Sequence, residues 1–120
     1  MTLGEYQEMA MTTCTPSSDN FAYMMLNLMG EVGEFAGKVA KAIRKEKAVV
    51  YTNNLILSRK EEMSADDIAE LRKELGDIAW QLAGVCSVMG WSLDDICVEN
   101  LAKLRDRQRR GVIVGDGDNR

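Results

Sequence analysis

The sequence contains no histidine, a single proline and few aromatic residues. Without histidine, the Ser-His-Asp and Cys-His nucleophile systems, the HExxH zinc proteases and the Glu-x-x-His di-iron bundles are excluded. Any metal must therefore be held by oxygen ligands or by cysteine. The scarcity of proline and aromatics, together with many Ala, Leu, Glu, Lys and Arg residues, favours helix over sheet and predicts an all-α protein.

Cysteine is also scarce, because only Cys14, Cys86 and Cys97 are present. They are odd in number and far from CxxC spacing, which is typical of reduced thiols rather than of a disulfide framework. The first twenty residues do not form a signal peptide, and no apolar run approaches the length of a membrane span. We therefore expect a cytoplasmic protein without a membrane partner.

The charge balance is acidic, with a net charge of −4 at pH 7. Nucleic acid would be repelled by the molecule as a whole, although a local basic run lies near the C-terminus. We therefore expect no nucleic-acid partner. The length of 120 residues and a hydrophobic content of 46% suffice for one core, so a single domain is the expectation.

Capping signals mark the first two expected helices. Thr2 and Glu5 form a capping-box pair, which predicts a short helix that ends before Pro16. The polar run SSDN at residues 17–20 supplies an N-cap for a second helix of about 25 residues, expected from Phe21 to near Lys45. The first half of the chain is thus predicted to be helical.

The second half of the chain is expected to contain two further helices, from Ser64 to Gly90 and from Ser92 to Gly111. Residues 46–63 show no steady period and are interpreted as a connecting excursion, with a helical turn expected in LILSRKEE. The tail, residues 112–120, is too rich in Gly and Asp to be helical. The prediction is a four-helix-bundle-like single domain over residues 1–120.

The second expected helix carries an apolar stripe that should face the core. This stripe consists of Phe21, Met25, Leu28, Val32, Phe35, Val39 and Ile43. A second stripe at its boundary consists of Asn27, Glu31, Glu34 and Lys38. Gly30, Gly33 and Gly37 lie on the far side, where they would admit the backbone of another helix or of a second subunit, unless they are merely tolerated.

The third expected helix repeats this arrangement of acids beside an apolar stripe. One of its flanks carries Glu70, Glu74, Asp77 and Gln81. If the two helices pack side by side, Glu31 and Glu34 would converge with Glu74 and Asp77, and four carboxylates repel one another unless a cation lies among them. Oxygen ligands without histidine favour Mg²⁺ or Mn²⁺. The alternative is that these acids form a solvated face.

The last expected helix carries positive charge along one flank, where Asn100, Lys103, Arg107 and Arg110 lie. Basic residues near a helix C-terminus also interact favourably with its dipole, which is the simpler interpretation of Arg105 and Arg109. An acidic metal site beside a basic flank is what a phosphate ester with Mg²⁺ would require.

Three runs of the sequence closely resemble the MazG-like nucleotide pyrophosphohydrolases, a group related to the dimeric dUTPases and dCTP pyrophosphatases. These runs are LMGEVGEFAGKVAKAIRK, LRKELGDIAWQLAGVCSVMGWSLDDI and ENLAKLRDRQRRG. The family hallmark is E-x-x-E on one helix and E-x-x-D on the next, which Glu31, Glu34, Glu74 and Asp77 match. The resemblance extends over residues 20–111, but the connection between the two motifs is longer than usual because of residues 46–63.

The resemblance implies an all-α enzyme that hydrolyses a nucleoside triphosphate between its α- and β-phosphates, giving the monophosphate and pyrophosphate. The four acids of the motif would hold one or more Mg²⁺ ions, and one of them would activate the attacking water. Asn100 and Lys103 match family positions that contact the triphosphate. Lys38 and Arg107 are added as substrate-binding candidates from the helix geometry.

Family relatives form homodimers or dimers of dimers whose helices complete one another's sites, so a homodimer or homotetramer is expected. The base preference stays open, with Tyr6, Asn20, Phe21 and Trp80 as candidates for a base pocket or for the core. The role also stays open between nucleotide-pool house-cleaning and precursor supply. The rival interpretation is a non-catalytic helical module that binds a nucleotide or a protein partner.

Overall fold

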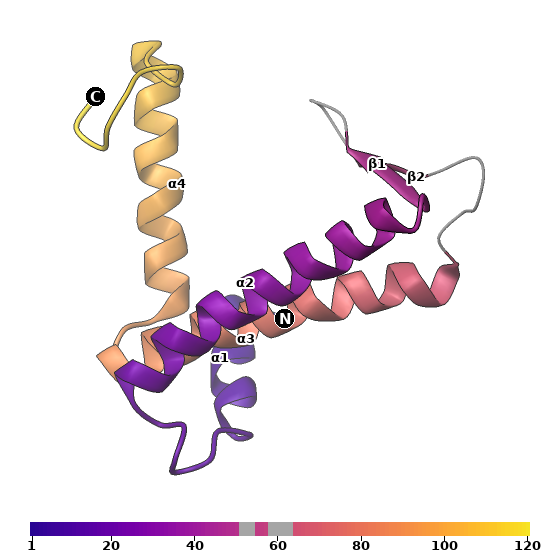
Figure 1. Ribbon diagram of the computed structural model, residues 1–120. Helices are drawn as coiled ribbons and strands as arrows, with labels where there is room; N and C mark the ends of the chain where they lie inside the picture. The colour runs from indigo at the N-terminus through magenta and orange to yellow at the C-terminus, as the bar shows by residue number, and fades with distance from the viewer. Residues whose placement is uncertain (51–54, 58–63) are drawn as a thin grey trace.

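The computed structural model describes residues 1–50, 55–57 and 64–120, and in them four α-helices and one short β-hairpin (Figure 1). The helices are α1 (Leu3–Met11), α2 (Phe21–Arg44), α3 (Ala65–Met89) and α4 (Leu93–Arg110). Between α2 and α3, strand β1 (Ala48–Val50) pairs antiparallel with β2 (Leu55–Leu57). The predicted all-α class is confirmed.

The ends of the helices follow the capping signals in the sequence. At α1, the Thr2 hydroxyl accepts from the Glu5 amide while the Glu5 carboxylate accepts from the Thr2 amide, and Ser64 with Asp67 forms the same box at α3. Such a cap is typically worth about 1 kcal/mol. After α3 and α4, Gly90 and Gly111 adopt left-handed backbone with φ values of 72° and 71°, which glycine allows without strain.

The helical turn expected in LILSRKEE is wrong at its first three residues, which form strand β2. The remainder of that segment lies outside the described residues. The reversal into β1 begins at Glu46, whose φ is 59°, and the Lys47 amide donates to the Ala42 carbonyl. The sequences of the two strands contain β-branched residues, which favour extended backbone. The antiparallel pairing of the strands provides hydrogen-bond partners for their main-chain groups. A search for helical periodicity does not detect such pairing.

The helices α2 and α3 lie side by side and form the most extensive contact between the described elements (Figure 1). Helix α1 packs against α3, where the Trp80 indole donates to the Ala10 carbonyl at 3.1 Å and to the Thr13 hydroxyl at 2.9 Å. Trp80 is therefore fixed by α1. Helix α4 extends away from the α2–α3 pair and, within the described part of the chain, has no Cα atom within 8 Å of a Cα atom of α2.

The core between α2 and α3 is built around Met24, whose side chain is fully buried beside Gly84. The predicted core stripe of α2 is wrong in part, because Phe21, Met25 and Val32 stay between 44% and 49% exposed. The face of α2 that packs against α3 is instead the neighbouring one, which carries Met24. Small residues of α3 such as Gly84 leave room for the flexible Met24 side chain. Helical periodicity alone does not predict such a local fit.

The chain is less compact than a closed globule, with a radius of gyration of 17.7 Å against about 14 Å expected for this length. Large apolar side chains remain exposed on both long helices and on α4, including Met29, Leu75, Val98 and Leu101. Among the residues that the structure describes, no helix is both long enough and apolar enough to span a bilayer.

Candidate active site

Three carboxylates from two helices meet between α2 and α3. Glu31 of α2 and Glu74 and Asp77 of α3 each place an oxygen within 4.8 Å of the others. The three-residue spacing puts Glu74 and Asp77 on the same face of α3, and the side-by-side packing of the helices brings Glu31 opposite them. We call these three residues the acidic cluster. Glu34, the fourth acid of the motif, is exposed one turn further along α2.

The acidic cluster is electrostatically strained. Burial raises the pKa of the Glu31 carboxyl above its ordinary value, and the charges of Glu34, Asp77 and Glu74 raise it further. A long hydrogen bond of 3.4 Å from the Asn27 amide opposes this shift. Glu34 therefore contributes to the same electrostatic site, although it lies outside the three-carboxylate group.

Two oxygens of the acidic cluster lack partners. Oε2 of Glu31 and Oε2 of Glu74 are buried and accept no hydrogen bond from any described residue. Buried carboxylate oxygens without a donor are costly to the fold, and a hard divalent cation would satisfy them. Glu31, Glu74 and Asp77 therefore fit Mg²⁺ or Mn²⁺ by their chemistry and by their convergence, with Glu34 as an additional donor nearby.

Lys38 is the cation that the structure brings to the acidic cluster. Its Nζ lies 2.5 Å from Oε1 of Glu74 and 3.4 Å from Oε2 of Glu70. The hydrogen bond to Glu74 is the main reason why the pKa of Lys38 is raised, so the ammonium is fully charged at neutral pH. Lys38 was predicted from helix geometry alone as a substrate-binding residue, and it lies directly beside the acids.

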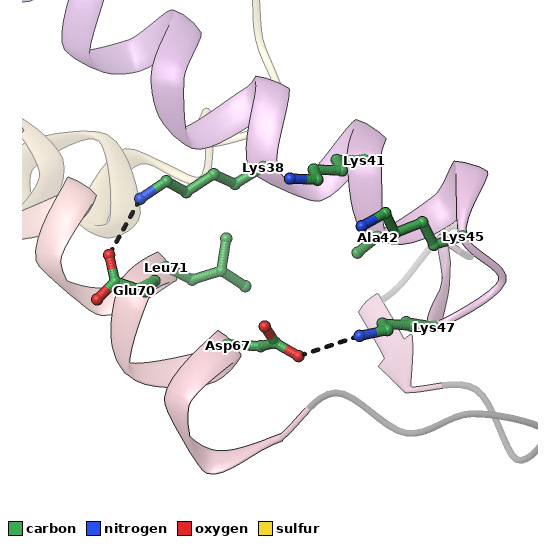
Figure 2. A pocket seen from close by; sticks show the side chains of 8 residues that line it. All are labelled: Lys38, Lys41, Ala42, Lys45, Lys47, Asp67, Glu70 and Leu71. Atoms are coloured by element: carbon green, nitrogen blue, oxygen red, sulfur yellow. Dashed lines mark hydrogen bonds and ion pairs between the residues drawn. The ribbon is translucent and has the colours of Figure 1, made fainter.

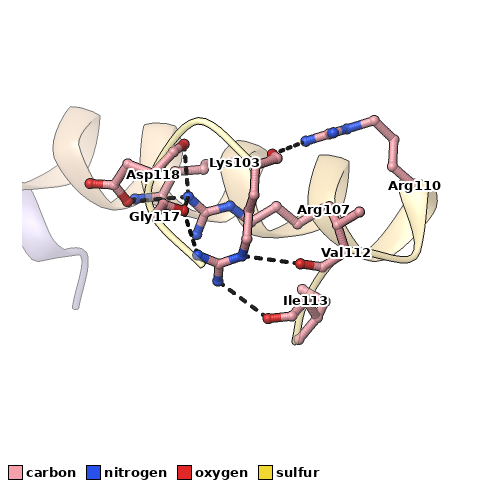
Figure 3. Close-up of polar contacts among 8 residues, drawn as sticks. Lys103, Arg107, Arg110, Val112, Ile113, Gly117 and Asp118 are labelled. Atoms are coloured by element: carbon pink, nitrogen blue, oxygen red, sulfur yellow. Dashed lines mark hydrogen bonds and ion pairs between the residues drawn. The ribbon is translucent and has the colours of Figure 1, made fainter. Parts of the chain in front are cut away.

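The predicted substrate-binding residues of α4 lie elsewhere in the chain. Asn100 lines an apolar cavity of about 570 Å³ that also includes Leu28 of α2. Figure 3 shows that Lys103 and Arg107 face the C-terminal tail, where Asp118 accepts from them at 3.3 Å and 3.1 Å. Within one chain, the tail therefore partners these two cations, and they do not contact the acidic cluster.

Two features close to the acids or to Lys38 carry no role in the predictions from the sequence. Gln81 was placed on the acidic flank without a role, but it is only 2% exposed and its Oε1 has no partner among the described residues. The signal was its position one turn after Asp77. The lysines at positions 41, 45 and 47 were also overlooked, although the run KVAKAIRKEK places Lys38, Lys41 and Lys45 at helical spacing.

Comparison with known proteins decides the family. A family model described as the MazG nucleotide pyrophosphohydrolase domain matches residues 20–112, a span that includes Glu31, Glu34, Glu74 and Asp77. The chain belongs to this family. The Gene 37 protein of Mycobacterium phage L5 is similar, with 36% identity over 104 residues that cover 87% of this chain and 80% of the phage protein. No solved structure matches the chain.

Membership of the MazG family indicates a nucleotide pyrophosphohydrolase. The family is generally dependent on a divalent metal, and the acidic cluster offers oxygen donors of the type that such a metal prefers. A nucleotide substrate is consistent with this membership.

Proposed function

We propose that the protein hydrolyses nucleoside or deoxynucleoside triphosphates between the α- and β-phosphates, releasing the monophosphate and pyrophosphate. The observation that carries the proposal is the convergence of Glu31, Glu74 and Asp77, with two buried carboxylate oxygens that lack partners. Glu34 joins them as the fourth donor. Mg²⁺ is the proposed ion, with Mn²⁺ as its substitute, because both prefer oxygen ligands.

A bound divalent ion would screen the phosphate charges, polarise the phosphorus and lower the pKa of a bound water. The chain's own residues have separate tasks. Glu34 lies beside the acidic cluster but outside it, so in addition to its proposed role as a metal donor we assign it to accept the proton of the attacking water. The water oxygen bonds to the α-phosphorus as the bond to the bridging oxygen breaks, and Lys38 stabilises negative charge on the departing pyrophosphate.

We further propose a homodimer, or a homotetramer made of two dimers, in which a partner subunit completes the site. The residues of α4 that match triphosphate contacts do not reach the acids within one chain. The glycine face of α2 is open as well, since nothing described lies within 4 Å of a Cβ placed at Gly33 or Gly37. A partner helix would cover this face and the exposed apolar residues around it.

The proposed setting is the cytosol, with the whole chain acting as one MazG-like domain. Cys14, Cys86 and Cys97 are free thiols, which fits a reducing compartment. The proposed products fit either nucleotide-pool house-cleaning or the supply of monophosphate precursors. A panel of canonical and damaged nucleoside triphosphates would identify the substrate and separate these roles.

The first prediction concerns the four acids. We expect Glu34→Gln and Asp77→Asn to abolish Mg²⁺-dependent pyrophosphate release, because each removes a charge that the reaction needs. Circular dichroism should show folded helices in both variants. Glu8→Gln is the matched control, because Glu8 is an exposed acid of α1 outside the site, and it should keep full activity.

The same assay separates the proposal from its rivals. Product analysis must show monophosphate with pyrophosphate, and formation of diphosphate with phosphate would overturn the proposed bond cleavage. Near-normal turnover in both acid variants would refute the assigned site. Nucleotide binding without any product across the panel would instead favour a non-catalytic binding module.

A further inference from the structure

A cavity of about 320 Å³ lies where the C-terminal end of α2 meets the start of α3, close to the β-hairpin (Figure 2). We call it the lysine cavity. Its described lining consists of Lys38, Lys41, Ala42, Lys45, Lys47, Asp67, Glu70 and Leu71. Ala42 is buried and packs with Ala48 and Leu71, so the lysines surround a small apolar surface.

The described lining carries more positive than negative charge. The two acids have partners, because Lys47 lies 3.6 Å from Asp67 and Lys38 lies 3.4 Å from Glu70. Hydrogen bonds lower the pKa of both acids, mainly from the Ser64 backbone to Asp67 and from Lys73 to Glu70, so both are ionised at neutral pH. Four ammonium groups therefore face two carboxylates.

The excess positive charge lies on Lys41 and Lys45. Neither ammonium group makes a hydrogen bond or an ion pair among the residues that the structure describes. The negative end of the α2 dipole attracts cations, and Arg44 in the same last turn serves that purpose without lining the cavity. The dipole does not explain why lysines one turn apart border the same cavity. A bound anion would satisfy both groups.

The lysine cavity adjoins the acidic cluster through one residue. Lys38 contacts Glu74 of the cluster and Glu70 of the cavity lining, so its ammonium stands between them. A phosphate chain bound at the acids can therefore continue past Lys38 toward Lys41 and Lys45. The volume of about 320 Å³ is at the small end of ligand pockets, which run roughly from 300 to 1,000 Å³, and the described lining has no aromatic side chain to stack on a base.

We propose that the lysine cavity binds a diphosphate group, supplied either by the β- and γ-phosphates of the substrate or by released pyrophosphate. This inference rests on the proposed function for the origin of the diphosphate. It adds Lys41 and Lys45 as phosphate-binding residues and predicts how the triphosphate is oriented in the site. The phosphates extend toward the β-hairpin end of the α2–α3 pair.

Direct binding of inorganic pyrophosphate tests the proposal without turnover. Isothermal titration calorimetry at low ionic strength, with chelator present, would compare the wild type with Lys41→Gln/Lys45→Gln. We expect the Kd of the double variant to rise at least about tenfold, since charge-assisted hydrogen bonds are lost. The matched control is Arg44→Gln/Arg72→Gln, which removes two charges from the same helices outside the cavity and should keep the wild-type Kd.

Equal losses in both double variants would overturn the proposal, because they would show a diffuse charge effect. Absence of pyrophosphate binding to the wild type would overturn it as well. The result is independent of catalysis, since an inactive protein that binds pyrophosphate through Lys41 and Lys45 keeps the cavity assignment while losing the proposed function. If the protein is active but Lys41→Gln/Lys45→Gln binds pyrophosphate like the wild type, the proposed function is kept and the assignment of the cavity is overturned.

Steady-state kinetics then distinguish the two sources of diphosphate. If the cavity holds the substrate's β- and γ-phosphates, Lys41→Gln/Lys45→Gln raises KM for the triphosphate and leaves inhibition by the monophosphate unchanged. If the cavity holds only the released product, KM stays constant and inhibition by pyrophosphate weakens. Either result supports diphosphate binding at the cavity.

Discussion

At the scale of single side chains, burial and then the charges of three acidic neighbours disfavour the ionised form of Glu31. Its partner is the long Asn27 contact, since Lys38 pairs with Glu74 instead. We expect Glu31→Gln to raise the metal-free melting temperature by a few degrees, because the amide removes repulsion within the cluster. Thermal unfolding followed by circular dichroism in the presence of chelator measures this change.

The same variant should lose its response to metal. Wild-type protein is expected to melt at a higher temperature when Mg²⁺ is added, since a ligand that binds only the folded state stabilises it. Glu31→Gln should show little of this increase, while Glu8→Gln should respond like the wild type. A metal-free melting temperature lower than that of the wild type would contradict the idea that repulsion dominates at Glu31.

At Gly84, the addition of a single Cβ atom should change the stability of the fold. A Cβ at Gly84 would overlap the Met24 sulfur, and the Met24 side chain is fully buried. We expect Gly84→Ala to destabilise the fold by about 1–3 kcal/mol, the usual range for overpacking a core. Urea unfolding at equilibrium is the measurement.

Gly76 provides the matched control on the same helix. Nothing described lies within 4 Å of a Cβ at Gly76, so Gly76→Ala should stabilise α3 by roughly 1 kcal/mol through helix propensity. Opposite signs for the two substitutions would locate the close contact between α2 and α3 at Gly84. Equal effects would show that Met24 moves aside freely.

At the scale of structural elements, the contact of the C-terminal tail with α4 should depend on pH. Hydrogen bonds from Arg107 and then Lys103 lower the pKa of the Asp118 carboxyl below the ordinary value of 3.8. A lowered pKa in the folded state means that the contact stabilises the tail above pH 3.8 and is lost as the pH falls below 3.8 through the folded pKa. We expect carbon NMR of the Asp118 carboxyl to show a midpoint below 3.8.

Removal of the main donor tests the cause of this shift. In Arg107→Gln, the Asp118 midpoint should move up toward 3.8, whereas Arg105→Gln should leave it where it was. The tail contact also has a bearing on the proposed activity. Asp118 must leave Lys103 and Arg107 before these cations can bind phosphate.

The helix ends could be predicted from the sequence because capping is local. Thr2, Asn20, Ser64 and Ser92 each cap the helix that follows them, as their side chains and neighbours indicate. The packed faces were harder to predict. The face of α2 that packs against α3 depends on how Met24 fits against Gly84. This is a contact between residues 60 positions apart in the sequence. Periodicity alone carries no such information.

At the scale of the whole molecule, the described residues present large apolar side chains that remain exposed in the single chain. Val98 and Leu101 of α4 are 64% and 49% exposed and lie one turn apart. We expect light scattering after size exclusion to show a dimer or tetramer, and Val98→Asp to shift it toward monomer, because a charge in an apolar interface is costly. Gln108→Glu, which adds a charge to an exposed polar position of α4, should leave the assembly intact.

A monomeric wild type at micromolar concentration would contradict this prediction and the shared-site proposal with it. Conversely, loss of activity in Val98→Asp together with loss of the dimer would support completion of the site by a partner subunit. Val98 lies outside the acidic cluster, so its effect on turnover would operate through assembly.

The sequence predicts the convergence of the acids better than the positions of the basic residues. The E-x-x-E and E-x-x-D spacing is a property of single helices, and the pairing of α2 with α3 brings Glu31 to Glu74 and Asp77. The predicted basic residues depend on where α4 points, which the short Gly90 turn and the contacts with α1 determine. Lys103 and Arg107 therefore lie against Asp118 in the single chain.

The contact between Lys38 and Glu74 means that the acidic cluster already holds a monovalent counter-ion. A divalent ion bound as proposed would use the other oxygen of Glu74, Oε2, which has no described partner, and would lie close to this ammonium. The affinity measured for the ion would then include its repulsion from a cation tethered to α2. The same repulsion would favour movement of the Lys38 ammonium toward the lysine cavity, so loading with metal would increase the positive charge available to an incoming polyanion.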